Sequence, residues 1–246
     1  MPVFRIGNAL HYFAHVPKCG GSSVEAYLRR RFGSLAFLDT RHLDLPEAAR
    51  WTRSSPQHVP AAAFHRLIPP DWIASSFAVV RDPVKRLVSA FQYQVEVEGT
   101  VAPLWSIDEW FDDWLGRAEA EPFLYDNHLR PQSQIVPEGA TVFRLEDGLD
   151  ALVAHLDRLA GDAKGPRRIP KENVRRKAMA PDAERLIPSA ATLARVASFY
   201  AEDYRRFGYA AETGAGAAPA PAPARAVSGR RGVIGRLVTT LTGRRP

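Results

Sequence analysis

The sequence has a single cysteine, Cys19, among 246 residues. One thiol cannot form an internal disulfide and cannot build a cysteine-based zinc site alone, so we expect a reducing compartment, the cytoplasm. Long apolar runs are also missing, because Arg, Asp, Pro and Gly interrupt them before the roughly 20 residues that span a bilayer. We therefore expect no transmembrane helix. Met1–Leu10 lacks a charged region followed by an apolar one, so we also expect no cleaved secretory signal.

The main part of the sequence lacks an excess of either charge. The net charge is +6, with 33 basic and 27 acidic residues, and residues 214–246 contain six arginines and no acid. Subtracting these six leaves 27 basic residues against 27 acidic ones in the rest of the chain. A formally neutral body disfavours a surface that follows a nucleic-acid backbone, so we expect no nucleic-acid partner.

The composition predicts one domain followed by two short segments. Residues 1–211 have enough apolar material for a single core, whereas residues 214–224 consist only of Gly, Ala and Pro. We interpret 212–227 as a disordered linker, because this composition has too little to bury. Residues 228–246 place an apolar stripe between arginines, which predicts a short basic amphipathic helix with weak affinity for an anionic membrane surface, at the inner face of a membrane. A disordered tail is the alternative.

Short apolar strands alternate with helical patterns along residues 1–211. This alternation predicts an α/β fold, a P-loop-like parallel β-sheet flanked by helices on both faces. The strands are expected at 10–16, 77–80 and 141–145. The helices are expected at 22–32, 84–94, 107–115, 149–159 and 190–207.

A loop typical of anion binding follows the first of these strands, with the sequence His-Val-Pro-Lys-Cys-Gly-Gly-Ser-Ser at residues 15–23. Glycine lets backbone N–H groups approach a phosphate, a helix N-terminus adds a favourable dipole, and Lys18 supplies a mobile positive charge. Ser22 and Ser23 offer hydroxyl donors. The lysine precedes the glycines, so this is not the common triphosphate loop. An ordinary helix N-cap is the alternative for Gly-Gly-Ser alone.

A second anion-binding candidate begins where strand 77–80 ends, with the sequence Arg-Asp-Pro-Val-Lys-Arg-Leu-Val-Ser at residues 81–89. Arg81 is expected to emerge at the edge where ligands bind in open sheets. Asp82 is expected to cap the following helix. Ser89 lies two helical turns further, and it reaches the same phosphate if the helix leans over the crevice. A plain Arg-Asp pair beside a capped helix is the alternative.

Together the two loops resemble those of the PAPS (3′-phosphoadenosine 5′-phosphosulfate)-dependent sulfotransferases, particularly the carbohydrate-type, family 2-like ones. Their motifs read Pro-Lys-x-Gly-Gly-x-Ser and Arg-Asp-Pro-x-x-Arg-x-x-Ser, and both occur here in that order. The resemblance implies PAPS as the donor, with its 3′ phosphate held by Arg81 and Ser89. Lys171 and Asn173, in a basic stretch, are further donor-binding candidates. The resemblance implies that the 5′ phosphosulfate is held by Pro17, Lys18, Cys19, Gly20, Gly21, Ser22 and Ser23.

Sulfonate transfer needs an attacking hydroxyl, a base for its proton and positive charge on the departing phosphate oxygen, and we expect it to require no metal. Lys18 is predicted to stabilise that oxygen. His65 is predicted to be the base, because it follows a short apolar run upstream of the Arg81 strand, where the resemblance places a catalytic histidine. His128 and Arg130 are the second candidates, either lining the acceptor site or, for His128, acting as the base.

The sequence therefore predicts an enzyme, a sulfotransferase that modifies a hydroxyl-bearing acceptor. A carbohydrate or glycoconjugate is favoured, while a lipid headgroup or small alcohol remains open. One alternative is a P-loop nucleotide-phosphate kinase, against which the missing Gly-Lys-Ser/Thr argues. Another is a non-catalytic membrane-surface binding protein on the same scaffold.

Overall fold

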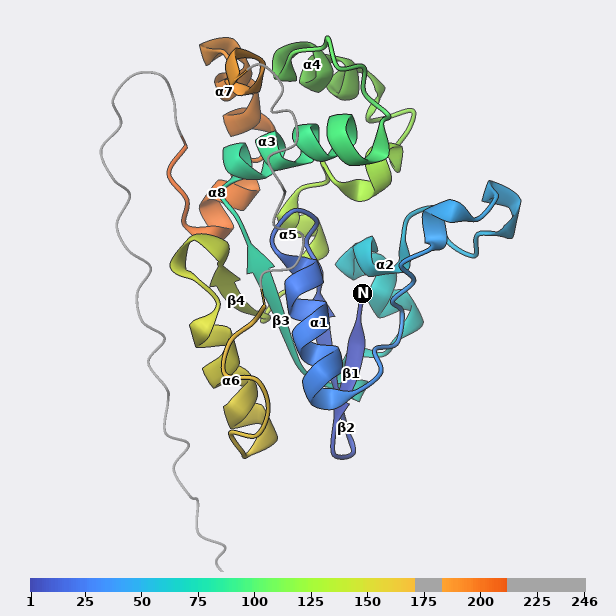
Figure 1. Ribbon diagram of the computed structural model, residues 1–246, viewed down its shortest axis with the longest axis vertical. Helices are drawn as coiled ribbons and strands as arrows, with labels where there is room; N and C mark the ends of the chain where they lie inside the picture. The colour runs from blue at the N-terminus through green and yellow to red at the C-terminus, as the bar shows by residue number, and fades with distance from the viewer. Residues whose placement is uncertain (171–182, 212–246) are drawn as a thin grey trace, which may run out of the picture.

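The core of the protein is a four-stranded sheet with the strand order β1-β2-β3-β4. The computed structural model describes residues 1–170 and 183–211. β1 and β2 form an antiparallel hairpin, whereas β2, β3 and β4 run parallel (Figure 1). The expected parallel sheet is thus confirmed, with an antiparallel strand added at one edge. The strands are β1 (Val3–Ile6), β2 (Ala9–Ala14), β3 (Ile73–Val80) and β4 (Thr141–Arg144).

The central strand β3 is longer than its apolar run. Phe77–Val80 is buried throughout, as expected for a strand covered on both faces, but the strand starts four residues earlier, at Ile73. Ser75 and Ser76 interrupt the apolar pattern there, and Ser75 forms a hydrogen bond of 2.8 Å with His11 of β2. Pairing with a neighbouring strand therefore extends β3 beyond what its own hydrophobicity indicates.

Helices cover both faces of the sheet. Side chains alternate between faces along a strand, so Tyr12 and Phe13 of β2 point in opposite directions. Phe13 stacks on Phe77, and Phe77 contacts His155 of α6 (Asp150–Ala160), while α1 (Gly21–Phe32) packs against β1. On the other face Tyr12 stacks on Phe64 of α2 (Ala61–Leu67), with ring centroids 4.0 Å apart. The expected α/β architecture is confirmed.

A second group of helices lies beyond the carboxyl ends of the parallel strands (Figure 1). It has its own buried cluster around Phe91, Trp110 and Tyr200. The carboxyl ends of β2 and β3 therefore face a layer of helices, and the segments that leave these strands run between two packed bodies. The group consists of α3 (Pro83–Tyr93), α4 (Ile107–Arg117), α7 (Ala190–Phe199) and α8 (Ala201–Phe207).

The expected single helix over 190–207 is wrong, because the chain leaves the helical conformation at Tyr200. This residue has φ −99° and ψ 23°, and it separates α7 from α8. Its buried hydroxyl donates to the Leu129 carbonyl, and the turn lets Asp203 accept from the backbone N–H groups of Gln132 and Ser133, each at 2.8 Å. Long-range bonds set this break, so the helical periodicity of the segment does not reveal it.

Short irregular elements complete the described chain. A four-residue helix, α5 (Gln132–Ile135), packs beside α2, and a π-helical turn, Gln94–Glu98, extends α3. The 3₁₀ turns are His42–Asp44, Glu47–Ala49, Pro56–His58, Pro70–Trp72, Leu124–Asn127, Leu145–Asp147 and Ala183–Leu186.

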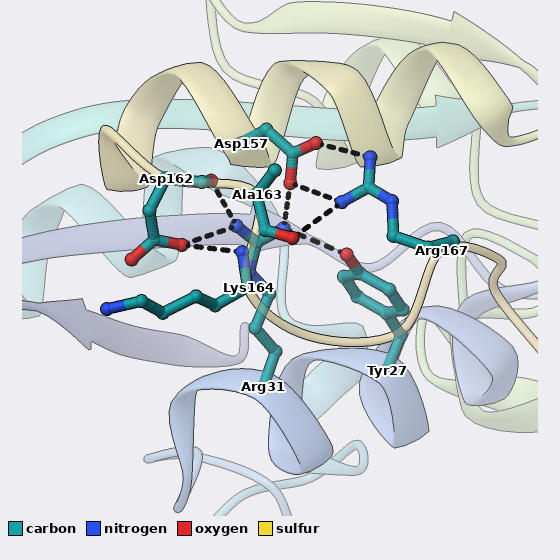
Figure 2. A network of polar contacts seen from close by, with 7 residues as sticks. All are labelled: Tyr27, Arg31, Asp157, Asp162, Ala163, Lys164 and Arg167. Carbon is teal, nitrogen blue, oxygen red and sulfur yellow. Dashed lines mark hydrogen bonds and ion pairs between the residues drawn. The ribbon is translucent and has the colours of Figure 1, made fainter.

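An ion-pair network ties α1 to α6 (Figure 2). Arg31 of α1 bonds Asp157 of α6 at 2.5 Å and the Tyr27 hydroxyl at 2.9 Å. Arg167 pairs with the same Asp157 carboxylate, at 2.7 Å. Arg167 lies four residues before Lys171 in the same basic stretch of the sequence, and its charge is paired with α6.

Several predicted features lie outside the described residues. They are Lys171, Asn173, the linker 212–227 and the basic segment 228–246. Within the described ranges, none of the helices combines the length and apolar character required to cross a bilayer.

A buried arginine anchors the second helical group to the segment that follows the 3₁₀ turn 124–127. Arg86 of α3 is 1% exposed and donates to the carbonyls of His128 and Arg130, each at 2.8 Å. Its guanidinium also lies 5.3 Å from the centre of the Tyr200 ring. The cation thus joins α3, the start of α8 and the 128–130 segment.

We predict that Arg86→Met destabilises the protein by about 1–3 kcal/mol, because two buried carbonyls lose their donors. Urea unfolding followed by circular dichroism measures the change, with the exposed neighbour Lys85→Met as the control. Equal unfolding midpoints for the two variants would show that Arg86 does not anchor these elements.

Candidate functional site

The loop between β2 and α1 turns through two left-handed residues. Lys18 has φ 66° and Gly20 has φ 79°, and α1 starts at Gly21 immediately afterwards. A non-glycine residue in this region is uncommon, which marks Lys18 as a constrained position. Within the described residues, the N-terminus of α1 has no side-chain cap, whereas Asp82 caps α3 by accepting from the Lys85 N–H at 2.9 Å. The first amides of α1 therefore have the geometry that an anion site requires, and anion binding at this loop stays a prediction.

A histidine under this loop explains why residue 21 is glycine. A Cβ atom at Gly21 would lie 1.9 Å from Nε2 of His15, so any side chain there would displace the ring. His15 Nδ1 lies 2.5 Å from Glu25 of α1, and both residues are buried. Burial lowers the pKa of His15. Burial also raises the pKa of Glu25, but the adjacent His15 outweighs it and brings that pKa below its usual value.

The two predicted anion loops meet in space. Arg81 follows the end of β3, and its Nη1 donates to the backbone carbonyl of Lys18 at 3.3 Å. The fully buried Gln132 accepts from the Arg81 N–H at 3.0 Å and donates to the Arg81 carbonyl at 2.8 Å. Its Oε1 also receives the Cys19 thiol at 3.4 Å. One amide side chain thus fixes both loops.

Other predicted loop residues differ in exposure. Ser22 is exposed at the first turn of α1, while Ser23 and Pro17 are buried. Burial raises the pKa of the Cys19 thiol to about 12, so this residue is a neutral packed group. Ser89 lies half-buried on α3, two turns after Arg81.

A buried His–Asp pair lies beside the first loop. His58 Nδ1 is 2.8 Å from Asp126 Oδ2, and the His58 ring lies edge-to-face with His15, with centroids 5.0 Å apart. The Ser55 N–H also donates to Asp126, at 2.5 Å. Burial raises the pKa of Asp126, but His58 outweighs it and holds that pKa well below its usual value. The carboxylate is therefore charged and fixes the orientation of the imidazole.

His128 connects this pair to Lys18. Its ring centroid lies 5.2 Å from that of His58 and 5.2 Å from that of Tyr93. The Lys18 ammonium lies 3.5 Å from the centre of the same Tyr93 ring. His128 Nδ1 bonds Gln94 at 3.0 Å, and burial lowers the pKa of His128 well below its usual value, so its ring is neutral. Lys18, Tyr93, His128 and His58 thus form one continuous cluster.

The segment that carries the carboxylate has unusual backbone geometry. Tyr125, Asp126 and Asn127 all have left-handed φ values, between 53° and 63°. Hydrogen bonds hold the segment, since Asn127 donates to the His58 carbonyl at 3.1 Å. Non-glycine residues in this conformation are found where the surrounding structure requires them, often at functional sites.

His65 and Arg130, two residues predicted from the sequence, contact residues other than Lys18, Tyr93, His128 and His58. His65 lies on α2 with its ring 5.3 Å from that of Phe64, and its buried Nδ1 has no hydrogen-bond partner in the described chain. The series of ring contacts that ends at Lys18 consists of His58, His128 and Tyr93. The Arg130 guanidinium bonds Asn127, Gln134 and the Pro122 carbonyl, so it holds its own segment together.

Sequence reasoning missed several residues of the site. They pair across long stretches of chain: His58 is 68 residues from Asp126, and Gln132 is 51 residues from Arg81. His58 lies seven residues before His65 and just before Pro60, where α2 is about to begin. This position was the one feature of the sequence that could have marked His58 as an alternative to His65. The missed residues are His15, Glu25, His58, Tyr93, Asp126 and Gln132.

Three side chains of the cluster are also arranged in a way that suits a divalent ion. His58, Asp126 and His128 each offer one ligand atom, and these atoms lie within 4.8 Å of one another. Two imidazoles and a carboxylate are a donor set that zinc accepts. Two of the three residues, His58 and Asp126, are joined by a hydrogen bond, and His128 bonds Gln94.

One family model matches most of the chain. The model of the sulfotransferase family matches residues 11–210. A solved sulfotransferase from Alicyclobacillus acidocaldarius is similar at 18% identity, covering 80% of this chain and 93% of its own, with a TM-score of 0.37. No curated protein matches. The family match includes most of β2, all of β3 and β4, both anion loops, His58 and His128, and the chain belongs to the sulfotransferase family.

Proposed function

We propose that the chain transfers the sulfonate group of PAPS to a hydroxyl acceptor of carbohydrate type. The observation that carries this proposal is the contact between the two anion loops, in which Arg81 Nη1 lies 3.3 Å from the Lys18 carbonyl. A donor with phosphate at both its 5′ and 3′ positions needs two anion sites on one crevice. The start of α1, where Gly20 offers no capping side chain, and the left-handed turn at Lys18 and Gly20 support the 5′ site.

In this proposal the first loop, residues 17–23, binds the 5′ phosphosulfate, and Arg81 with Ser89 binds the 3′ phosphate. The acceptor oxygen bonds to sulfur while the bond from sulfur to the 5′-phosphate oxygen breaks, which releases adenosine 3′,5′-bisphosphate (PAP). The Lys18 ammonium, held over the Tyr93 ring at 3.5 Å, neutralises the charge that develops on the departing oxygen.

The acceptor proton requires a base, and we propose His58 for this role. Asp126 accepts from His58 Nδ1 at 2.8 Å, which leaves Nε2 to take a proton. The charged carboxylate then stabilises the imidazolium that forms. His65, the base predicted from the sequence, and His128 are the competing candidates. His128 is already bonded to Gln94 through Nδ1, and burial disfavours its charged form.

The remaining expectations from the sequence concern the alternative functions, the cellular compartment and the residues outside the described ranges. The match to the sulfotransferase family argues against the alternative of a nucleotide-phosphate kinase. The hydrogen-bonded pair of His58 and Asp126 supports an enzyme over a protein that only binds. We propose a cytoplasmic protein, from its single cysteine. Weak contact of residues 228–246 with an anionic membrane stays a prediction, as does donor binding by Lys171 and Asn173.

We predict that PAP binds the purified protein and that Lys18→Ala and Arg81→Ala each weaken this binding about 10- to 100-fold, because each removes a charged contact to phosphate. Isothermal titration calorimetry measures both affinities, with the exposed Arg30→Ala at the far end of α1 as the control. Tight binding of ATP–Mg²⁺ in place of PAP would contradict the proposed donor.

We predict that His58→Gln lowers kcat by about 10²–10⁴-fold while PAP affinity stays close to that of the wild type, because a general base contributes that factor. Asp126→Asn is expected to lower kcat as well, since the orienting charge is lost. Release of PAP from PAPS, followed by chromatography, gives the rates. Loss of turnover in His65→Gln but not in His58→Gln would restore the sequence-based assignment.

We predict that dialysis against EDTA leaves the transfer rate unchanged and that added Zn²⁺ inhibits it, because zinc would occupy His58, Asp126 and His128 and block proton transfer. His128→Gln should weaken the inhibition. A rate that falls on EDTA treatment and returns with a divalent ion would instead assign these three residues to a required metal.

A further inference from the structure

A cavity of about 300 Å³ opens beside the histidine cluster. Water occupies about 30 Å³ per molecule in the liquid, so this space holds about ten non-hydrogen atoms, the size of one substituted six-membered ring. The cavity is bounded by the 3₁₀ turn at residues 42–44, the π-helical turn after α3, α4 and the 124–128 segment. Its lining residues are Leu43, Gln94, Glu98, Thr100, Arg117, Leu124, Tyr125, Asp126 and His128.

The inner wall of the cavity belongs to the proposed catalytic cluster. Gln94, Asp126 and His128 line it. The His128 ring contacts the Tyr93 ring, over which the Lys18 ammonium lies. The Tyr93 hydroxyl hydrogen-bonds the Glu98 carboxylate, which lines the outer part of the same cavity. The proposed base His58 bonds the lining residue Asp126, and Lys18 lies over the Tyr93 ring, which contacts the lining residue His128. His58 and Lys18 therefore lie directly behind the inner wall of the cavity.

The charged groups around the cavity favour a ligand without negative charge. Asp126 and Glu98 contribute two carboxylates to the lining, and burial keeps His128 neutral. The cationic member of the lining, Arg117, is paired with Glu121 at 2.9 Å and with Asp113 at 3.1 Å. Among the described residues of the lining, an anionic acceptor would meet two carboxylates and one arginine that is already paired.

The other lining groups suit a ring that carries hydroxyls. Leu43, Leu124 and Tyr125 offer apolar surface for the face of a ring. Gln94 and Thr100, joined by a hydrogen bond of 2.5 Å, offer polar atoms at the edge. A flat apolar wall with polar groups around it is the usual lining of a sugar or phenol site.

We propose that this cavity is the acceptor site and that it selects an uncharged alcohol of about one ring over a carboxylated or sulfated one, with Glu98 as the residue that determines this selectivity. The inference rests on the proposed sulfonate transfer and names its acceptor class. It narrows the expected carbohydrate acceptors to neutral ones.

Three pyranosides of matched size test the selectivity: methyl β-D-glucoside, methyl β-D-glucosaminide and methyl β-D-glucuronide. We expect kcat/KM with PAPS to be about tenfold or more higher for the neutral glucoside than for the glucuronide, and the ratio to fall as salt screens the carboxylates. Glu98→Gln, which retains a hydrogen-bond partner for Tyr93, should bring the ratio of the two rates toward one.

Glu96→Gln is the matched control, since Glu96 lies on the same π-helical turn but does not line the cavity. Its glucoside-to-glucuronide ratio should equal that of the wild type. An unchanged ratio in Glu98→Gln, or a wild-type preference for the glucuronide, would overturn the inference while leaving sulfonate transfer intact.

Calorimetric titration of the PAP complex with the same three glycosides separates this inference from the proposed function. Binding that favours the glucoside, without transfer from PAPS to any of the three, would sustain the selectivity of the site and contradict the catalytic proposal. No binding of any glycoside to the PAP complex, together with no transfer, would overturn the acceptor site.

Discussion

The parallel pairing of β2 with β3 is the constraint on which the site depends. Parallel neighbours end at the same edge of a sheet, so the loops that leave them start side by side. Here Ala14 pairs with Ala78, which places the Lys18 loop next to Arg81 and allows the side chain of one loop to bond the backbone of the other. A shift in the register of these two strands would separate the Lys18 loop from Arg81, and with them the two proposed anion sites.

Buried polar side chains carry this arrangement from the sheet into the helical layer. Gln132 holds both loops, Asp203 holds the backbone at Gln132, and Arg86 holds the carbonyls of the neighbouring segment. Each of these groups is almost or fully inaccessible to solvent. A buried hydrogen-bonding group is costly to leave unpaired. Loss of one of these side chains therefore leaves its partner unpaired and destabilises the neighbouring segment as well. The cluster is therefore as rigid as the two cores between which it lies.

The sequence could predict the parts of the site that are encoded locally. The Lys18 loop and the Arg81 loop each combine a strand, a turn and a helix start within a short stretch, and the cap by Asp82 follows directly from its position. The cluster of Lys18, Tyr93, His128 and His58 is encoded differently, because its members come from the loop after β2, the end of α3, the position after the left-handed segment and a 3₁₀ turn. Only the folded chain shows that His58 meets Asp126, and two histidines seven residues apart look alike until α2 is known to begin between them.

The break at Tyr200 illustrates the same limit for the fold. The apolar periodicity of residues 190–207 is continuous, and nothing local distinguishes one helix from two. The hydroxyl of Tyr200 and the carboxylate of Asp203 decide the matter through bonds to residues about 70 positions earlier. Elements whose boundaries depend on partners far along the chain are thus the ones that periodicity places least well.

The three consecutive left-handed residues at 125–127 set stability against activity in this part of the chain. Each non-glycine residue in such a conformation costs on the order of 1 kcal/mol or more relative to an ordinary one. Glycine would remove that cost at any of the three positions, but at 126 it would also remove the carboxylate that orients His58. Under the proposed mechanism, selection for a more heat-resistant protein and selection for a faster one would therefore favour different residues at position 126.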